Sequence, residues 1–116
     1  MIGHFPALKR EIDRSALAAA AGDLEGAWCA LERAHILAQP NIGSHLRVHL
    51  LMLRLAVKHA DRREATGQIY RLLLAPVGAL SGRIPVGNTG RANVSAFKPM
   101  PVPADLEIIR SDQRDL

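Results

Sequence analysis

The sequence predicts an all-α protein made of two stacked helical hairpins, in a tetratricopeptide-like or four-helix-bundle arrangement, followed by an extended C-terminal wrap. The 116-residue chain is 48% hydrophobic but has only one Trp, one Tyr and two Phe. A composition rich in Ala and Leu and poor in aromatic residues favours close-packed helices. Four helical patterns precede Pro76, and Gly, Pro and Asn are frequent after it. We therefore expect a four-helix domain over residues 1–76 and an extended segment over residues 77–116, packed on the same domain.

The first hairpin is predicted from an alanine-rich stretch and a capping residue. Pro6 suits the first turn of a helix, and the run SALAAAA has a high helix propensity that ends at Gly22. Asp23 is a good N-cap for a second helix. The two expected helices cover residues 6–21 and 23–39.

The second hairpin follows a turn that contains Pro40 and Gly43. Ser44 can cap a third helix that runs to about residue 60. Asp61 can cap a fourth, which we expect to stop at Pro76 because proline removes a helix hydrogen bond. On this fourth helix, a stripe formed by Glu64, Gln68 and Arg71 is expected to face water, opposite an apolar side formed by Ala65, Ile69, Leu72 and Leu73.

A weak internal repeat relates the two hairpins. GDLEGAWCALERA aligns with ADRREATGQIYRL, so that Ala27 matches Ala65 at an offset of 65 − 27 = 38 residues. Tetratricopeptide units repeat at about 34 residues with similar spacing of small and large residues. The repeat therefore favours stacked hairpins, although the first helix of each pair lacks the Trp and Gly of the tetratricopeptide pattern.

The C-terminal segment is expected to be an ordered wrap rather than a disordered tail. It has no long helical or strand pattern, and only residues 104–110 suggest a short helix. Its large apolar residues would lose contact with water if they packed on the helices. These residues are Leu80, Ile84, Val86, Val94, Phe97 and Met100.

Composition and charge exclude several functional classes. The net charge of +4 comes mostly from arginines, but these are scattered along the chain, and no aromatic pair is placed for base stacking, so we expect no nucleic-acid partner. The longest apolar run, HLLMLRLAV, is too short to span a bilayer, and no apolar signal core follows the N-terminus. The single Cys29 excludes an intrachain disulfide and a CxxC zinc motif. These features favour a cytoplasmic protein without a membrane partner.

Three histidines are expected to converge near the turn of the central hairpin. On a helical wheel, His35 faces the core and Glu32 lies one turn back on the same side. His45 and His49 fall on the buried stripe of the third helix. Antiparallel pairing brings these four residues within two turns of the hairpin mouth, whereas His59 lies about 21 Å beyond His45 along the helix axis.

This set of side chains favours a metal site. Histidines at i and i+4 can share an ion, and a Glu-x-x-His pair on a facing helix adds a carboxylate and an imidazole. The candidate ligands are Glu32, His35, His45 and His49, and the metal is a divalent transition metal, with zinc preferred and iron or copper possible. A hydrogen-bonded polar core and acid–base catalysis without a metal are the alternatives. A core network is less favoured because each buried imidazole needs partners for both nitrogens.

The C-terminal segment is a candidate lid over this site. An antiparallel fourth helix would return the chain to the level of His45, so the segment starts beside the histidines. Asn88 and Asn93 are candidates for hydrogen bonds to the imidazole N–H groups. Met52, next along the histidine stripe, would suit copper(I) if it approached the metal, although a core position is common for methionine.

Several motifs resemble one bacterial family. LERAHILAQ, the His45-x3-His49 pair followed by Met52-Leu53, and the long segment GRIPVGNTGRANVSAFKPMPVPADL resemble the DUF3703 family of proteins of unknown function. The resemblance covers nearly the whole chain. It implies a small, mostly helical protein, often encoded near heavy-metal resistance genes, and it assigns no catalytic residue.

Two hypotheses for the function follow. The first is a metal-binding helical protein that acts as an accessory in heavy-metal handling or as a small metalloenzyme. The second is a tetratricopeptide-like interaction module with a protein partner and structural histidines. Metal content after purification without a histidine tag distinguishes them.

Overall fold

A computed structural model of the chain describes residues 4–82 and 85–114. The described residues form five helices: α1 (His4–Ala20), α2 (Leu24–Ala38), α3 (Ile42–Lys58), α4 (Arg62–Ser81) and α5 (Ala104–Arg114). None of the helices in these two ranges has both the length and the apolar character needed to cross a membrane.

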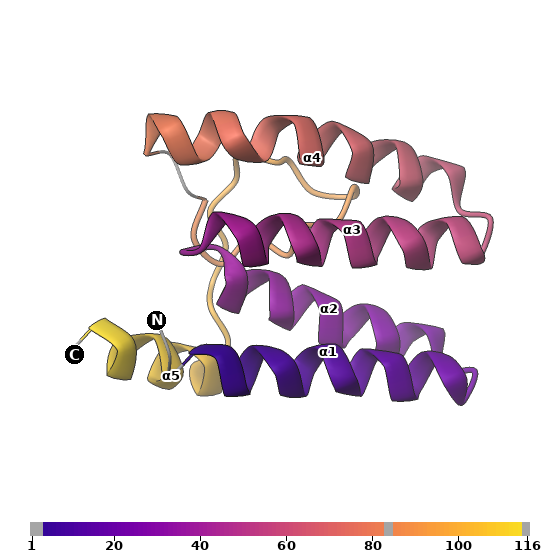
Figure 1. Cartoon of the computed structure of the whole chain (residues 1–116), viewed down its shortest axis with the longest axis horizontal. Helices are drawn as coiled ribbons and strands as arrows, with labels where there is room; N and C mark the ends of the chain where they lie inside the picture. Colours follow the sequence, from indigo (N-terminus) through magenta and orange to yellow (C-terminus); the bar gives the residue numbers. More distant parts are fainter. Residues whose placement is uncertain (1–3, 83–84, 115–116) are drawn as a thin grey trace.

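The first four helices lie side by side in a row (Figure 1). α1 packs on α2, α3 packs on α4, and a contact between α2 and α3 joins the two hairpins. α1 and α4 lie at opposite ends of the row, and α5 packs against α1 and α2. The prediction of an all-α fold with two stacked hairpins is confirmed.

Side-chain caps start three of the helices. Asp23 and Asp61 accept hydrogen bonds from the backbone N–H groups of Gly26 and Glu64, as N-cap residues do. The cap of α3 was predicted at Ser44, but Asn41 holds that position and accepts from the Ser44 N–H at 3.0 Å. The helix therefore begins at Ile42, close to the Pro40 turn.

α4 continues past Pro76, contrary to the prediction. Pro76 lies inside the helix, which ends at Ser81. The C-cap is Gly82, whose φ of 73° is the left-handed conformation that glycine adopts without steric cost. One proline removes a single hydrogen bond, and here the helix resumes beyond it. α5 is also longer than the short helix expected over residues 104–110.

The apolar core lies between α1, α2 and α3, with α5 closing it at one end. Alanines on α2, such as Ala27 and Ala34, are fully buried and allow close approach of the neighbouring helices. Met52 and Val48 of α3 fill the space against Leu37 of α2. The remaining large members of this core include Leu8, Trp28, Leu31, Leu55 and Leu106.

The described apolar residues that were expected to pack the C-terminal segment on the helices are not buried; Leu106 of α5 enters the core instead, and polar groups anchor part of the stretch before that helix. Leu80 is 90% exposed and Phe97 is 63% exposed, Val86 is also exposed, and Ile84 lies outside the described residues. Val94 and Met100 are half-buried. By contrast, Asn88 is almost completely buried. Its side chain donates a hydrogen bond within the segment, and its backbone carbonyl accepts one from His35 of α2.

Candidate metal centre

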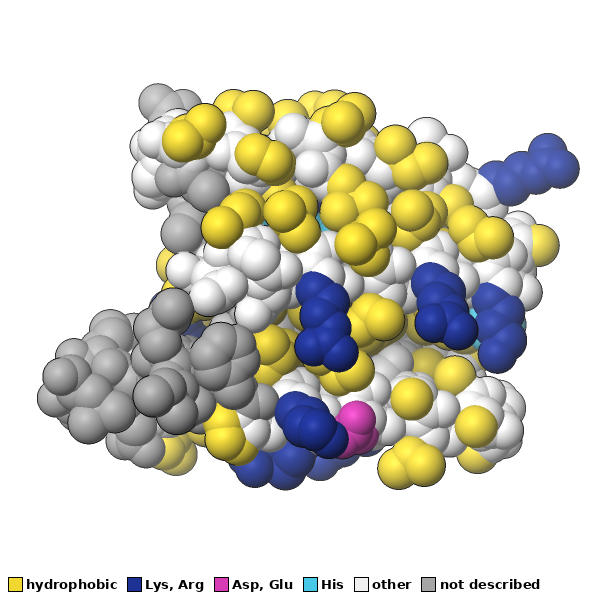
Figure 2. Space-filling model, viewed as in Figure 1, with side chains coloured by type: hydrophobic (Ala, Val, Ile, Leu, Met, Phe, Trp, Pro, Cys, Tyr) yellow, Lys and Arg dark blue, Asp and Glu magenta, His cyan; other side chains and the backbone are white. Residues whose placement is uncertain are grey.

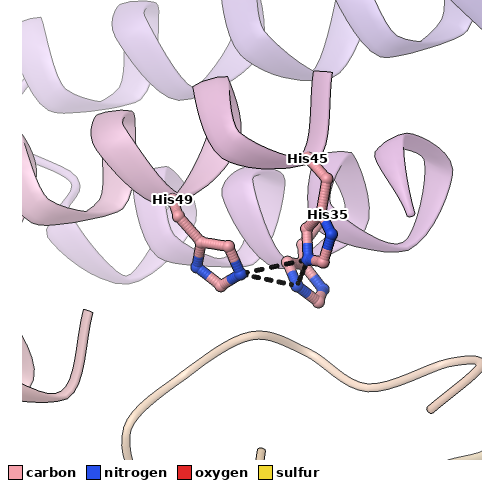
Figure 3. Close-up of side chains that lie close together, drawn as sticks. All are labelled: His35, His45 and His49. Atoms are coloured by element: carbon pink, nitrogen blue, oxygen red, sulfur yellow. Dashed lines mark hydrogen bonds between the residues drawn. The ribbon is translucent and has the colours of Figure 1, made fainter. Parts of the chain in front are cut away.

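Three imidazole rings from two helices point toward one another (Figure 3). His35 lies in the last turn of α2, and His45 and His49 lie in the first half of α3. The Nε2 atom of His35 is 3.0 Å from that of His45 and 3.1 Å from that of His49. The Nε2 atoms of His45 and His49 are also 3.1 Å apart. The three nitrogens therefore form a nearly equilateral triangle that can hold a metal ion.

The hydrogen bonds of the outer ring nitrogens fix the tautomers of two of these histidines. The Nδ1 of His35 lies 2.7 Å from the backbone carbonyl oxygen of Asn88, which only accepts hydrogen bonds. The Nδ1 of His49 lies 2.7 Å from Oε1 of Gln68. The Gln68 amide cannot be reversed, because its Nε2 donates to the carbonyl of Gly90 and to Glu64, both acceptors. In both neutral rings Nδ1 therefore carries the proton, and Nε2 presents a lone pair.

This arrangement places two lone pairs against each other in the centre of the triangle. Neither His35 nor His49 has a proton on Nε2 to donate, so the 3.1 Å contact between these atoms is repulsive whichever tautomer His45 adopts. A metal ion placed between these nitrogens would accept both lone pairs and so remove the repulsion. Two imidazole nitrogens bound to tetrahedral zinc at about 2.0–2.1 Å are about 3.3–3.4 Å apart, so only a small expansion of the triangle is needed.

Burial keeps the three rings neutral. It lowers the pKa of His35 well below its ordinary value, and the neighbouring histidines lower it further. The same causes, burial first and His49 second, lower the pKa of His45 to about 4. Burial also lowers the pKa of His49, against an opposing effect of its hydrogen bond with Gln68. At neutral pH all three are therefore in the unprotonated form that binds a metal.

The histidine triangle opens into a cavity of about 260 Å³. Besides the histidines, its walls come from the α2–α3 turn, from α4 and from the C-terminal segment. The volume exceeds that of a single water molecule several-fold, so a metal at the histidines would have room for a further ligand. The cavity walls include Ile42, Arg71, Leu74, Ala75, Asn88 and Phe97.

The stripe on α4 that was expected to face water is buried. Gln68 is completely buried, and Glu64 and Arg71 are nearly so, while Ile69 and Leu73 of the supposed apolar side are exposed. The C-terminal segment covers this polar side: Glu64 accepts from Arg91 at 2.8 Å. The regular spacing of these three residues on one helical face is the sequence signal that could have identified them as a group. The stripe is buried because a segment far along the chain covers it, and helical periodicity cannot predict such a contact.

Glu32 is not brought into the histidine cluster, contrary to the prediction. Its carboxylate accepts from Nη1 of Arg91 at 3.2 Å, and the Arg91 guanidinium lies 3.9 Å from the centre of the Trp28 ring. Arg91 thus joins Glu32 of α2 to Glu64 of α4. The carboxylate faces the C-terminal segment, so the group of side chains that could hold a metal within the described residues consists of histidines alone.

The other predicted residues near the site have different positions. Asn88 does contact His35, but through its backbone carbonyl, while its side-chain amide donates to Ser95 and Lys98 and shapes the segment. Asn93 is exposed. Met52 is completely buried in the apolar core.

The two other singled-out side chains are also away from the triangle. His59 is exposed at the end of α3, where its Nδ1 lies 3.1 Å from the carbonyl of Leu55. Cys29 is exposed on α2. The position of His59 agrees with the expectation that it lies apart from the other three histidines.

Gly90 allows the C-terminal segment to reach the histidines. Its φ of 82° is left-handed, and a Cβ at this position would lie 2.6 Å from Cδ2 of His35. Its carbonyl also accepts from Gln68, the residue that orients His49. A single glycine therefore sets the contact between the segment and two of the three histidines.

Comparison with known proteins gives a family match. No curated protein and no solved structure matches the chain. A family model described as "Protein of unknown function (DUF3703)" matches residues 4–109, which is most of the 116-residue sequence. The resemblance seen in the sequence motifs is thereby confirmed, and the chain belongs to the DUF3703 family.

Proposed function

We propose that this protein binds one divalent transition metal ion through the Nε2 atoms of His35, His45 and His49. The observation that carries the proposal is the pair of facing lone pairs on His35 and His49, whose outer nitrogens are committed to the acceptors Asn88 and Gln68. Metal-bound histidines commonly donate their other N–H to a carbonyl or carboxylate in this way.

Zinc is the preferred metal, and iron or copper are compatible with the same donors. Zinc accepts three neutral imidazoles and a fourth ligand, and sites with an open fourth position are typical of catalysis rather than of structural support. A bound zinc would supply a Lewis acid beside the cavity. Met52 and Asn93 are outside this proposal, because Met52 is buried in the apolar core and Asn93 is exposed.

Two roles are consistent with such a centre: an accessory in bacterial heavy-metal handling, or a small metalloenzyme. The first role follows from the genomic setting that the family resemblance implies. The second is supported by the cavity beside the histidines. Both require the same metal-binding step, which is therefore the first point to test.

The test is metal content of protein purified without a histidine tag. We expect about one zinc ion per chain in the wild-type protein after loading and removal of free metal. His49→Ala should lose most of this metal because it removes one of three ligands. His59→Ala is the matched control on the same helix and should retain it, since His59 lies at the far, exposed end of α3. Equal metal loss in both variants, or no metal in the wild type, would refute the proposal.

Protein interaction is the second candidate function, supported by an exposed apolar surface. Figure 2 shows apolar side chains gathered over α3 and α4. Ile69, Leu73 and Val77 of α4 are between 51% and 72% exposed, and Leu50 and Val57 of α3 are also exposed. Apolar patches of this kind often mark protein-binding surfaces. If the histidines are structural and this surface is the functional one, Leu73→Glu will change complex formation while the wild type binds no metal.

A further inference from the structure

We propose that the cavity beside the three histidines takes a small organic carboxylate, bound between the metal ion and the guanidinium of Arg71. This inference rests on the proposed metal function and adds the chemical class of the second ligand. Three observations support it: the hydrogen bonds of Arg71, the positive charge of a metal-loaded site and the apolar walls of the cavity.

Arg71 is a buried cation with spare hydrogen-bonding capacity. Only 8% of the residue is exposed. Its Nη1 donates to the carbonyl of Gly67 at 3.2 Å and its Nη2 donates to that of Val94, but its buried Nε has no hydrogen-bond partner. Each Nη group also carries a second N–H, so the guanidinium can donate further hydrogen bonds to a ligand. Arg71 lines the same cavity as the histidines.

No carboxylate neutralises Arg71 directly. Within residues 4–82 and 85–114, the ion pairs of buried and half-buried acidic groups involve other arginines, and Glu64 in particular is paired with Arg91. The charge of Glu64 is close enough to act on Arg71, but Glu64 forms its direct ion pair with Arg91. Arg71 is also close enough for its charge to lower the pKa of both His35 and His49.

Metal binding makes this charge imbalance larger. Imidazoles bind a metal as neutral ligands and add no negative charge, so a loaded site would combine the dication with the Arg71 cation. A carboxylate in the cavity would offset part of this positive charge. A carboxylate suits the pair, because one oxygen can bind the metal while the other accepts from a guanidinium N–H.

The remaining walls favour an organic acid over a purely polar anion. The cavity is lined by Leu74 and Ala75 of α4, by Ile42 at the start of α3 and by Phe97 of the C-terminal segment. Apolar walls with a few convergent polar groups are typical of sites for small organic ligands. Phosphate would satisfy the charges but would leave these walls without an apolar partner.

The experiment uses full-length protein loaded with cobalt(II), whose visible absorption reports changes in coordination. Isobutyrate is the probe, the neutral isobutyramide tests the need for charge, and inorganic phosphate tests the need for an apolar group. We expect saturable spectral changes with isobutyrate, at least about tenfold weaker binding of phosphate, and no response to isobutyramide. A response to phosphate as strong as that to isobutyrate, or no response to isobutyrate, would overturn the proposal.

Variants of Arg71 separate this inference from the metal site itself. Arg71→Met should keep the cobalt stoichiometry and weaken isobutyrate binding by about tenfold or more. Arg54→Met, an exposed arginine of α3, is the control and should bind isobutyrate normally. If Arg71→Met does not fold, Arg71→Lys, which keeps the charge but loses the planar fork, should bind isobutyrate more weakly than wild type. Unchanged affinity in the folded variant contradicts the inference, whereas a wild type that binds no cobalt contradicts the metal site as well.

Discussion

The apolar core and the polar layer of this protein are built in different ways. The core between α1, α2 and α3 consists of alanines and large aliphatic residues that follow helical periodicity. The polar layer joins α2, α3 and α4 to the C-terminal segment through histidines, Gln68 and the Arg91 ion pairs. The core can tolerate loss of volume as long as the helices still pack. The polar layer depends on the position and tautomer of individual atoms, and this is the requirement of a binding site.

The core should determine stability without determining metal binding. Met52→Ala removes a fully buried side chain, and such a truncation costs about 2–5 kcal/mol of unfolding free energy. We expect a correspondingly lower chemical-denaturation midpoint, with metal stoichiometry unchanged in the folded protein. Leu50→Ala, an exposed position on the same helix, should have little effect. Selective metal loss in folded Met52→Ala would instead give Met52 a role at the metal.

The Arg91 ion pairs should hold the polar layer together. Arg91→Gln leaves the carboxylate of Glu64 buried without its charge partner, and we expect a loss of about 2–4 kcal/mol in unfolding free energy. Adding Glu64→Gln should recover part of this loss, because it removes the unpaired charge. Additive effects in the double-mutant cycle would show that the pair contributes little and that the layer is held by other contacts.

Gly90 tests the contact between the C-terminal segment and the histidines. Gly90→Ala places a methyl group against the His35 ring, while Gly22→Ala has the same left-handed φ but nothing within 4 Å of the added carbon. Both should lose about 1–2 kcal/mol from backbone strain. Only Gly90→Ala should also weaken metal binding, measured by competition with a chelator. Equal metal affinity in the two variants would show that the contact between the C-terminal segment and His35 does not affect metal binding.

The pH dependence of the metal-free protein should reflect the buried histidines. Their folded-state pKa values are lowered, to about 4 for His45, so the unfolded chain binds more protons below its ordinary histidine pKa of about 6.5. Stability should therefore be complete above this pH and fall as the pH is lowered toward 4, by up to about 1.4 kcal/mol per pH unit for each histidine. His45→Gln should reduce this slope. A flat profile between pH 6.5 and 4 contradicts neutral buried rings.

Helical periodicity predicted the parts of the site that lie on the central hairpin. It placed His35, His45 and His49 on facing sides of α2 and α3 because one turn connects these helices directly. It placed Glu32 there too, since residues one turn apart share a helical face, but the C-terminal segment brings Arg91 to that carboxylate. The burial of Glu64, Gln68 and Arg71 was missed for the same reason. A contact between a helix and a distant irregular segment produces no periodic pattern in the sequence of the helix or of the segment, so it could not be predicted.

X-ray absorption at the zinc edge of the loaded, untagged protein tests the central claim most directly. The account predicts three imidazole nitrogens at about 2.0–2.1 Å and one further oxygen or nitrogen ligand, with one imidazole fewer around any zinc that His49→Ala still retains. A zinc ion with one or two imidazoles in the wild type, or an unchanged spectrum in His49→Ala, would contradict the three-histidine centre.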